Sequence, residues 1–145
     1  MPDYATIGRA REDAREGKSP STQAGEFVRE EMDHIREGKH GARSPQQAIA
    51  IGLSKARRAG VKLGTPKGSA ALKKKAAQDE KAGEQPRRKV SAKRSRATEQ
   101  ALKREPRTSA SKSALSRQAK NAAAKRGKKS RSAAAVKAAR TRRAA

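Results

Sequence analysis

The sequence lacks cysteine and tryptophan and contains one tyrosine and one phenylalanine. The absence of cysteine excludes disulfide bonds and zinc sites built from thiolates. Tyr4 and Phe27 are too few to form the row of rings on which single-stranded nucleic acids stack their bases. No apolar run approaches the roughly 18 residues that a membrane-spanning helix needs, and the first residues lack the apolar stretch of a secretory signal.

Large apolar and acidic side chains are also scarce. Leu, Ile, Val and Phe make up 14 of the 145 residues. Residues 1–60 hold 11 basic and 9 acidic side chains, whereas residues 61–145 hold 27 basic and 5 acidic, with no acidic one beyond Glu105. Strongly charged chains with so little to bury tend to be disordered. We therefore expect a small folded N-terminal part and a polycationic region that binds a polyanion.

The clearest helix signal lies in residues 44–60, SPQQAIAIGLSKARRAG. Ser44 is a favourable N-cap, Pro45 suits the first helical position, and Gln47 can close a capping box back onto Ser44. Gly60 stands where a left-handed residue ends a helix. The spacing of the small and apolar residues predicts one packed face, made of Ala48, Ile49, Gly52, Leu53 and Ala56.

Two further helices are expected before this one. The first covers residues 4–16 and places Tyr4 and Ile7 on the same side as Ala10 or Ala14. The second begins at Ser19 or Ser21 and ends at Gly38. Residues 15–24 and 36–48 share the pattern REGK followed by SP, which predicts a helix end, a turn and a new helix start. The expected core of this module consists of Phe27, Val28, Met32, Ile35, Ile49, Leu53 and Ala56.

These patterns predict a mostly α protein. Residues 1–60 would form a helical hairpin or three-helix module, and residues 61–68 a linker containing Gly and Pro. Residues 69–145 would form a basic, low-complexity tail that is mostly disordered, with transient helices that gain order when their charge is neutralised. A core this small often needs a partner, so residues 24–59 are also a candidate surface for a protein partner or for self-association.

The basic region is the candidate nucleic-acid-binding site. The alternative is a solvated tail that only keeps the protein in solution, but its excess of charge is larger than solubility requires. The side chains would act as distributed charge on phosphates, with no single one essential. They are Lys73, Lys74, Lys75, Arg87, Arg88, Lys89, Lys93, Arg94, Arg96, Arg117, Lys120, Lys125, Arg126, Lys128, Lys129, Arg131, Lys137, Arg140, Arg142 and Arg143.

The segment SPQQAIAIGLSKARRAG resembles the signature of a family of short basic bacterial proteins of unknown function. The resemblance runs from about Glu26 to Lys67, and its specific part covers residues 47–60. It implies kinship and no activity, because the family has none established. In composition alone, residues 101–145 also resemble linker-histone tails and bacterial histone-like proteins, which implies chromatin-like binding.

Two other kinds of site, a helix-turn-helix and a metal site, are alternatives to the basic region. A helix-turn-helix built from residues 27–35 and 48–59 would place Gln46 and Gln47 near base edges, but its recognition helix offers little else there. His34 and His40, with Glu30, Asp33 or Glu37 nearby, lack a standard metal-ligand spacing. We therefore expect solvated histidines, and we interpret the carboxylates Glu30, Glu31, Asp33 and Glu37 as a charged helix face.

The sequence as a whole favours a nucleic-acid-binding accessory protein of the nucleoid, acting on the backbone of duplex DNA with little sequence specificity. An RNA- or ribosome-associated protein and a protein-interaction adaptor are the alternatives. No phosphate-binding loop, nucleophile elbow or catalytic triad pattern is present, so we expect no enzyme activity, cofactor or small-molecule substrate.

Overall fold

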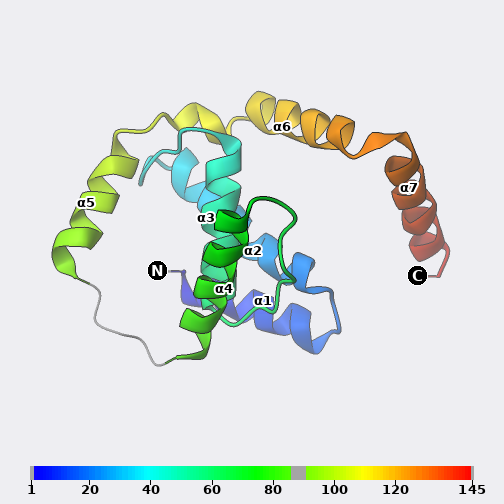
Figure 1. Cartoon of the computed structure of the whole chain (residues 1–145), viewed down its shortest axis with the longest axis horizontal. Helices are drawn as coiled ribbons and strands as arrows, with labels where there is room; N and C mark the ends of the chain where they lie inside the picture. Colours follow the sequence, from blue (N-terminus) through cyan, green and yellow to red (C-terminus); the bar gives the residue numbers. More distant parts are fainter. Residues whose placement is uncertain (1, 86–90, 145) are drawn as a thin grey trace. The chain divides into compact units, whose positions relative to one another are not determined.

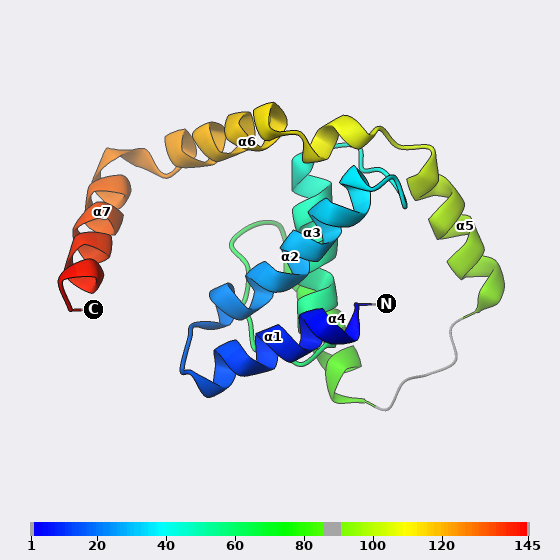
Figure 2. The same ribbon diagram turned by 180° about the vertical axis from the view of Figure 1, so that it is seen from behind.

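The computed structural model describes residues 2–85 and 91–144. These residues form seven α-helices and one short 3-10 helix, with no strand among them (Figures 1 and 2). The helices are α1 (Tyr4–Arg15), α2 (Pro20–Arg36), α3 (Pro45–Arg58), α4 (Ala70–Glu84), α5 (Ala92–Lys103), the 3-10 helix η1 (Arg107–Ala110), α6 (Lys112–Lys125) and α7 (Gly127–Ala144). The chain divides into two compact units, residues 1–110 and residues 111–145, called unit 1 and unit 2 below.

The expectation of a mostly disordered tail over residues 69–145 is wrong, because helices α4 to α7 occupy most of it. Local signals explain them. Alanine is the best helix former, and serine side chains cap two of the starts: Ser69 accepts from the N–H of Leu72, and Ser111 accepts from the N–H of Ala114. The helices therefore exist without the neutralised charge that transient helices would require.

The first three helices end in the same way. Gly17, Gly38 and Gly60 all have positive φ, at 72°, 80° and 96°. The N–H of the following residue bonds back to the last turn in each case, as Lys39 does to the carbonyl of His34 at 3.0 Å. This is the Schellman arrangement, and it satisfies carbonyls that a helix end leaves unpaired. The turn and helix-start pattern read from the repeated REGK and SP segments is therefore present in the folded chain.

Helix α3 starts at the expected serine cap. The Ser44 hydroxyl accepts from the N–H of Gln47 at 3.2 Å, with Pro45 as the first helical residue. The second bond of the expected capping box differs by one residue. The Gln47 side chain accepts from the N–H of Arg43 at 2.7 Å and not from that of Ser44. The start of α3 is thus fixed on both sides of Ser44, next to the loop that carries His40.

Small residues let the helices of unit 1 approach closely. Phe27 and Ile35 of α2 are fully buried, and a cluster of buried residues joins α1, α2, α3 and the start of the next loop. Gly52 lies against the backbone of Val28: a Cβ added there would come within 2.7 Å of the Val28 Cα. The cluster consists of Ala10, Ala24, Phe27, Ala56 and Val61.

The expected core residues lie at or near this cluster. Phe27, Met32, Ile35 and Ala56 are buried, while Val28, Ile49 and Leu53 are half-buried. Tyr4 differs from expectation: its side chain is 87% exposed, and Thr6 is the residue of the first turn of α1 that is buried.

Helix α4 packs on α3 (Figure 1). Gly83 makes this possible, because a Cβ at that position would lie 2.5 Å from the carbonyl oxygen of Arg57. Farther along unit 1, the last turn of α5 and the stretch that follows it are tied to the loop between α2 and α3. The N–H of Gly41 donates to the carbonyl of Leu102 at 2.8 Å, and that of Ala42 donates to Pro106 at 3.1 Å.

Candidate functional site

The predicted nucleic-acid-binding residues lie on the outer faces of four helices. Lys73, Lys74 and Lys75 are exposed on α4, and Lys93, Arg94 and Arg96 are exposed on α5. Arg87, Arg88 and Lys89 lie outside the described residues. The others belong to unit 2 and are exposed on α6, at its C-cap or on α7: Arg117, Lys120, Lys125, Arg126, Lys128, Lys129, Arg131, Lys137, Arg140, Arg142 and Arg143.

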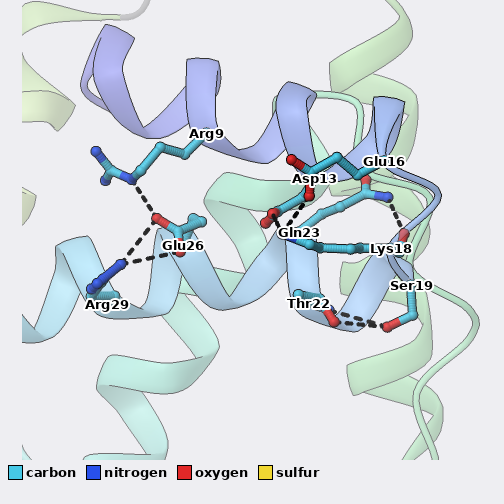
Figure 3. A network of polar contacts seen from close by, with 9 residues as sticks. All are labelled: Arg9, Asp13, Glu16, Lys18, Ser19, Thr22, Gln23, Glu26 and Arg29. Carbon is cyan, nitrogen blue, oxygen red and sulfur yellow. Dashed lines mark hydrogen bonds and ion pairs between the residues drawn. The ribbon is translucent and has the colours of Figure 1, made fainter. Parts of the chain in front are cut away.

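In unit 1, carboxylates lie against many of the basic side chains. Figure 3 shows the contact between α1 and α2, where Arg9 and Arg29 both pair with Glu26. In the same view Lys18, in the turn between the helices, lies 2.8 Å from an oxygen of Asp13. These pairs reduce the positive charge that α1 and α2 present to a polyanion.

Unit 2 differs because it contains 12 basic and no acidic side chains. No carboxylate side chain within the unit can neutralise its lysines and arginines. At about 100° per residue, the seven basic residues of α7 are spread over about two thirds of the circumference of the helix. Unit 2 therefore presents charge without a single preferred face, which suits contact with a phosphate backbone more than a fixed set of base edges.

A second group of polar residues, all but Asp3 largely shielded from solvent, lies at the C-terminal half of α2. We call it the acid–imidazole cluster: Asp3, Glu30, Glu31, His34, His40 and Lys55. The side chains of Glu30 and Glu31 are 4% and 1% exposed, and those of His34 and His40 are 14% and 15% exposed. Glu30 and Glu31 therefore do not lie on an exposed charged helix face, and the two histidines are largely shielded, where solvated ones were expected.

The contacts of the cluster join three parts of unit 1. Lys55 of α3 lies between the two glutamates, with its Nζ 2.7 Å from Glu31 Oε2 and 3.5 Å from Glu30 Oε1. The His40 Nε2 lies 3.3 Å from Glu31 Oε1. The His34 Nε2 lies 3.6 Å from Asp3 Oδ2 and 3.9 Å from Glu30 Oε1.

From the sequence alone, His34 and His40 were considered with Glu30 and set aside for lack of a standard spacing, and they were not connected with Asp3, Glu31 or Lys55, although one signal was available. Glu31 and His34 are three residues apart on a helix and so share a face. The rest depends on tertiary structure: the turn at Gly38 brings His40 back over α2, and α3 supplies Lys55. One ligand atom from each of Glu31, His34 and His40 lies within 4.8 Å of the other two, and the same holds for Asp3, Glu30 and His34.

A third buried carboxylate, Asp79, joins α4 to α3. It is 2% exposed and accepts hydrogen bonds from Ser54 at 2.7 Å, from Arg58 at 2.8 Å and from Lys75. Burial raises the pKa of Asp79, but the hydrogen bonds from Lys75, Ser54 and Arg58 outweigh burial, so its pKa lies below the ordinary value. Lys55 and Arg58 of α3 are held by carboxylates and are therefore less available to contact a phosphate backbone.

The comparisons with known proteins add no relative: the chain matches no protein-family model, no curated protein and no solved structure. The resemblance of residues 26–67 to a family of short basic proteins therefore stays a prediction. Among the described residues, no helix is long and apolar enough to cross a membrane.

Proposed function

We propose that the protein binds nucleic acid through the basic helices of unit 2, with α4 and α5 contributing further charge. The observation that carries the proposal is the excess of positive charge in unit 2, which holds 12 basic side chains and no acidic one. Lysine and arginine on phosphates release condensed counterions, and this release is largely independent of base sequence. Binding in this mode is strong at low salt and weakens steeply as salt rises.

The aromatic side chains favour a duplex over a single strand. Phe27 is fully buried and is not available to stack on a base. Tyr4, at 87% exposed, is the one aromatic side chain left to do so. Since single-strand binders use several rings, a protein with one exposed ring is better suited to the backbone of a duplex. RNA duplexes and DNA duplexes share that backbone chemistry, so the competitor in the experiment distinguishes them.

The test compares two triple variants of the full chain that lower the net charge equally. The first replaces Lys128, Lys129 and Arg131 by Gln in unit 2. The matched control replaces Lys18, Arg29 and Lys39, which pair with carboxylates of unit 1, by Gln. Binding to duplex DNA is measured by fluorescence anisotropy across salt, with an RNA duplex as competitor.

We expect the unit 2 variant to lower the magnitude of the log–log salt slope by roughly 2–3, because each lost phosphate contact removes about 0.9. The control should leave the slope nearly unchanged. Equal weakening by the two variants would mean that only net charge matters, and it would overturn the assignment to unit 2. A wild-type slope shallower than about −5 would overturn nucleic-acid binding as the function, since it implies fewer than about six phosphate contacts.

A further inference from the structure

The acid–imidazole cluster has a shortage of positive charge. It contains two buried carboxylates, from Glu30 and Glu31, and one ammonium group, from Lys55, while the exposed carboxylate of Asp3 lies at its edge. With neutral imidazoles the buried part of the cluster carries a net charge of −1. Buried carboxylates are costly unless they are paired and hydrogen-bonded, so a cation would complete this site.

Glu31 shows this shortage of positive charge most clearly. It is 1% exposed, and neither of its carboxylate oxygens accepts a hydrogen bond. Lys55 approaches Oε2 to 2.7 Å as an ion pair, without the alignment of a hydrogen bond. A buried carboxylate normally has its lone pairs satisfied, so Oε1 of Glu31 is available to ligate a cation, while Oε2 is held by the ion pair with Lys55.

The His40 ring lies beside the same carboxylate. Its Nδ1 lies 3.1 Å from the carbonyl oxygen of Gly41, and because a carbonyl only accepts, the proton of the bond belongs to Nδ1. In the neutral ring the Nε2, which faces Glu31 Oε1 at 3.3 Å, then carries a lone pair. Two acceptors at this distance repel each other unless a proton or a cation lies between them. A backbone carbonyl on the far nitrogen is also the usual outer partner of a metal-bound histidine.

We propose that Glu31, His34 and His40 bind one divalent transition-metal ion of the zinc class. The distance between Glu31 Oε1 and His40 Nε2, 3.3 Å, fits two ligands of one tetrahedral ion, which lie about 3.3–3.4 Å apart when the metal–ligand bonds are about 2.0–2.1 Å. The imidazole of His34 is the third ligand, and it reaches the ion by rotating inward. In its present position one of its ring nitrogens lies within 4.8 Å of a ligand atom of Glu31 and of one of His40. Two imidazoles and one carboxylate suit zinc and its neighbours and leave a fourth position for water.

Lys55 and Glu30 have supporting roles in this arrangement. When the ion binds, it takes over the charge of Glu31, and the Lys55 ammonium stays with Glu30, whose Oε1 already lies 3.5 Å away. Glu30 Oε2 keeps its hydrogen bond from the backbone N–H of Asp3 at 3.3 Å. Lys55 thus competes with the ion for Glu31.

The first experiment uses the wild-type full chain and inorganic Zn²⁺ and Co²⁺. Zinc should raise the Tm at a 1:1 ratio, since a ligand that binds only the folded state stabilises it, while Mg²⁺, which prefers oxygen ligands, should not. The chain has two histidines in all, so the imidazole region of the NMR spectrum contains two rings. Both should shift on zinc addition and saturate together at one equivalent. Shifts of one ring only, or no saturation, would overturn the site.

The second experiment uses His40→Ala and Glu31→Gln, with Glu37→Gln as the matched control. Glu37 is an exposed carboxylate just past the same helix, paired with Lys39. Each ligand variant should bind zinc at least roughly 10- to 100-fold more weakly, the loss seen when even an outer partner of a metal ligand is removed. The control should bind as the wild type does. Unchanged binding in a folded His40→Ala variant would show that zinc binds elsewhere and would overturn the assignment.

Lys55→Gln separates a metal site from a purely structural ion pair. Without its competitor, Glu31 should bind zinc more tightly, and the gain in Tm on adding zinc should exceed that of the wild type. If Lys55 is simply the permanent partner of Glu31, and the histidines are protonated, the variant should lose stability that zinc does not restore. Loss without restoration would overturn the proposal, whether or not the glutamate variants fold.

Discussion

Units 1 and 2 have the same net excess of basic residues, but only unit 1 has carboxylates that pair with its basic side chains. In unit 1, lysines and arginines lie against carboxylates, as Arg29 does against Glu26 and Arg58 against Asp79. In unit 2, no acidic side chain is present to do this. Unit 1 also has a core in which Phe27 and Ile35 are fully buried, whereas Val136 of unit 2 is 53% exposed. The difference shows that unit 1 is organised for internal packing, whereas unit 2 exposes charge that no acidic side chain of its own can offset.

The largest effect should come from the core of unit 1. Replacing the fully buried Ile35 by Ala removes apolar contacts and leaves a cavity, and we expect a loss of about 3 kcal/mol in the free energy of unfolding. The matched control in unit 2 is Val136→Ala, at a half-exposed position, where the change should stay within about 0.5 kcal/mol. Urea unfolding followed by circular dichroism measures both. Equal losses would mean that unit 2 has a packed core as well.

A smaller effect is expected at the buried carboxylate between α3 and α4. Asp79→Asn keeps the shape of the side chain but removes charge-assisted hydrogen bonds from Arg58 and Lys75, and we expect a loss of about 2 kcal/mol at pH 7. Glu99→Gln, at an exposed carboxylate paired with Lys103, is the control and should unfold like the wild type.

The same variant gives a pH test with a defined sign. The pKa of Asp79 is lowered in the folded protein, so its stabilisation is fully present above the ordinary aspartate pKa and is lost as pH falls through the lower folded value. The difference in stability between the wild type and Asp79→Asn should therefore shrink below about pH 4. A difference that stays constant down to pH 2 would show that the charge of Asp79 is not what stabilises the contact.

Because α2 and α3 approach closely, replacing glycine by alanine should change the free energy of unfolding in opposite directions at two sites. Gly52→Ala places a Cβ 2.7 Å from the Val28 Cα, a backbone atom that cannot rotate away. Overpacking should outweigh the gain in helix propensity, for a net loss of about 1–2 kcal/mol. Gly25→Ala, on α2 with nothing within 4 Å, should instead gain about 0.5–1 kcal/mol. Thermal unfolding of the two variants checks the signs, and a gain at both sites would show that the helices separate more easily than the structure indicates.

The structural features that depend on residues close together in the sequence were predictable. The serine caps, the glycine turns and the helix over residues 45–58 all depend on residues within about one turn, and the sequence predicts them. The burial of Glu31 and Asp79 was not predictable in the same way, because it depends on partners far along the chain, such as Ser54 for Asp79. Low apolar content was misleading for residues 69–145, since alanine helices need little burial to form when their ends are capped.

The smallest effect is the response of zinc binding to salt, which should have the opposite sign to the response of DNA binding. The chain carries a net charge of +24, which repels a divalent cation and attracts a polyanion. Salt screens both effects, and the screening length falls from about 30 Å at 0.01 M to about 8 Å at 0.15 M. Over this range DNA binding should weaken by orders of magnitude, while zinc binding to the acid–imidazole cluster should strengthen roughly two- to threefold. Titrations in a salt with a weakly coordinating anion measure both constants.

The sign of the zinc response distinguishes a buried site from a surface one. Glu31 and its ion pair with Lys55 are shielded from solvent, so mobile ions reduce the repulsion from distant lysines and arginines more than they reduce the attraction inside the cluster. Zinc held loosely by exposed carboxylates such as Glu37 or Glu99 would respond in the opposite way, because there the attraction itself is screened. Zinc affinity that falls with salt in parallel with DNA affinity would therefore contradict the buried site, even if the stoichiometry were 1:1.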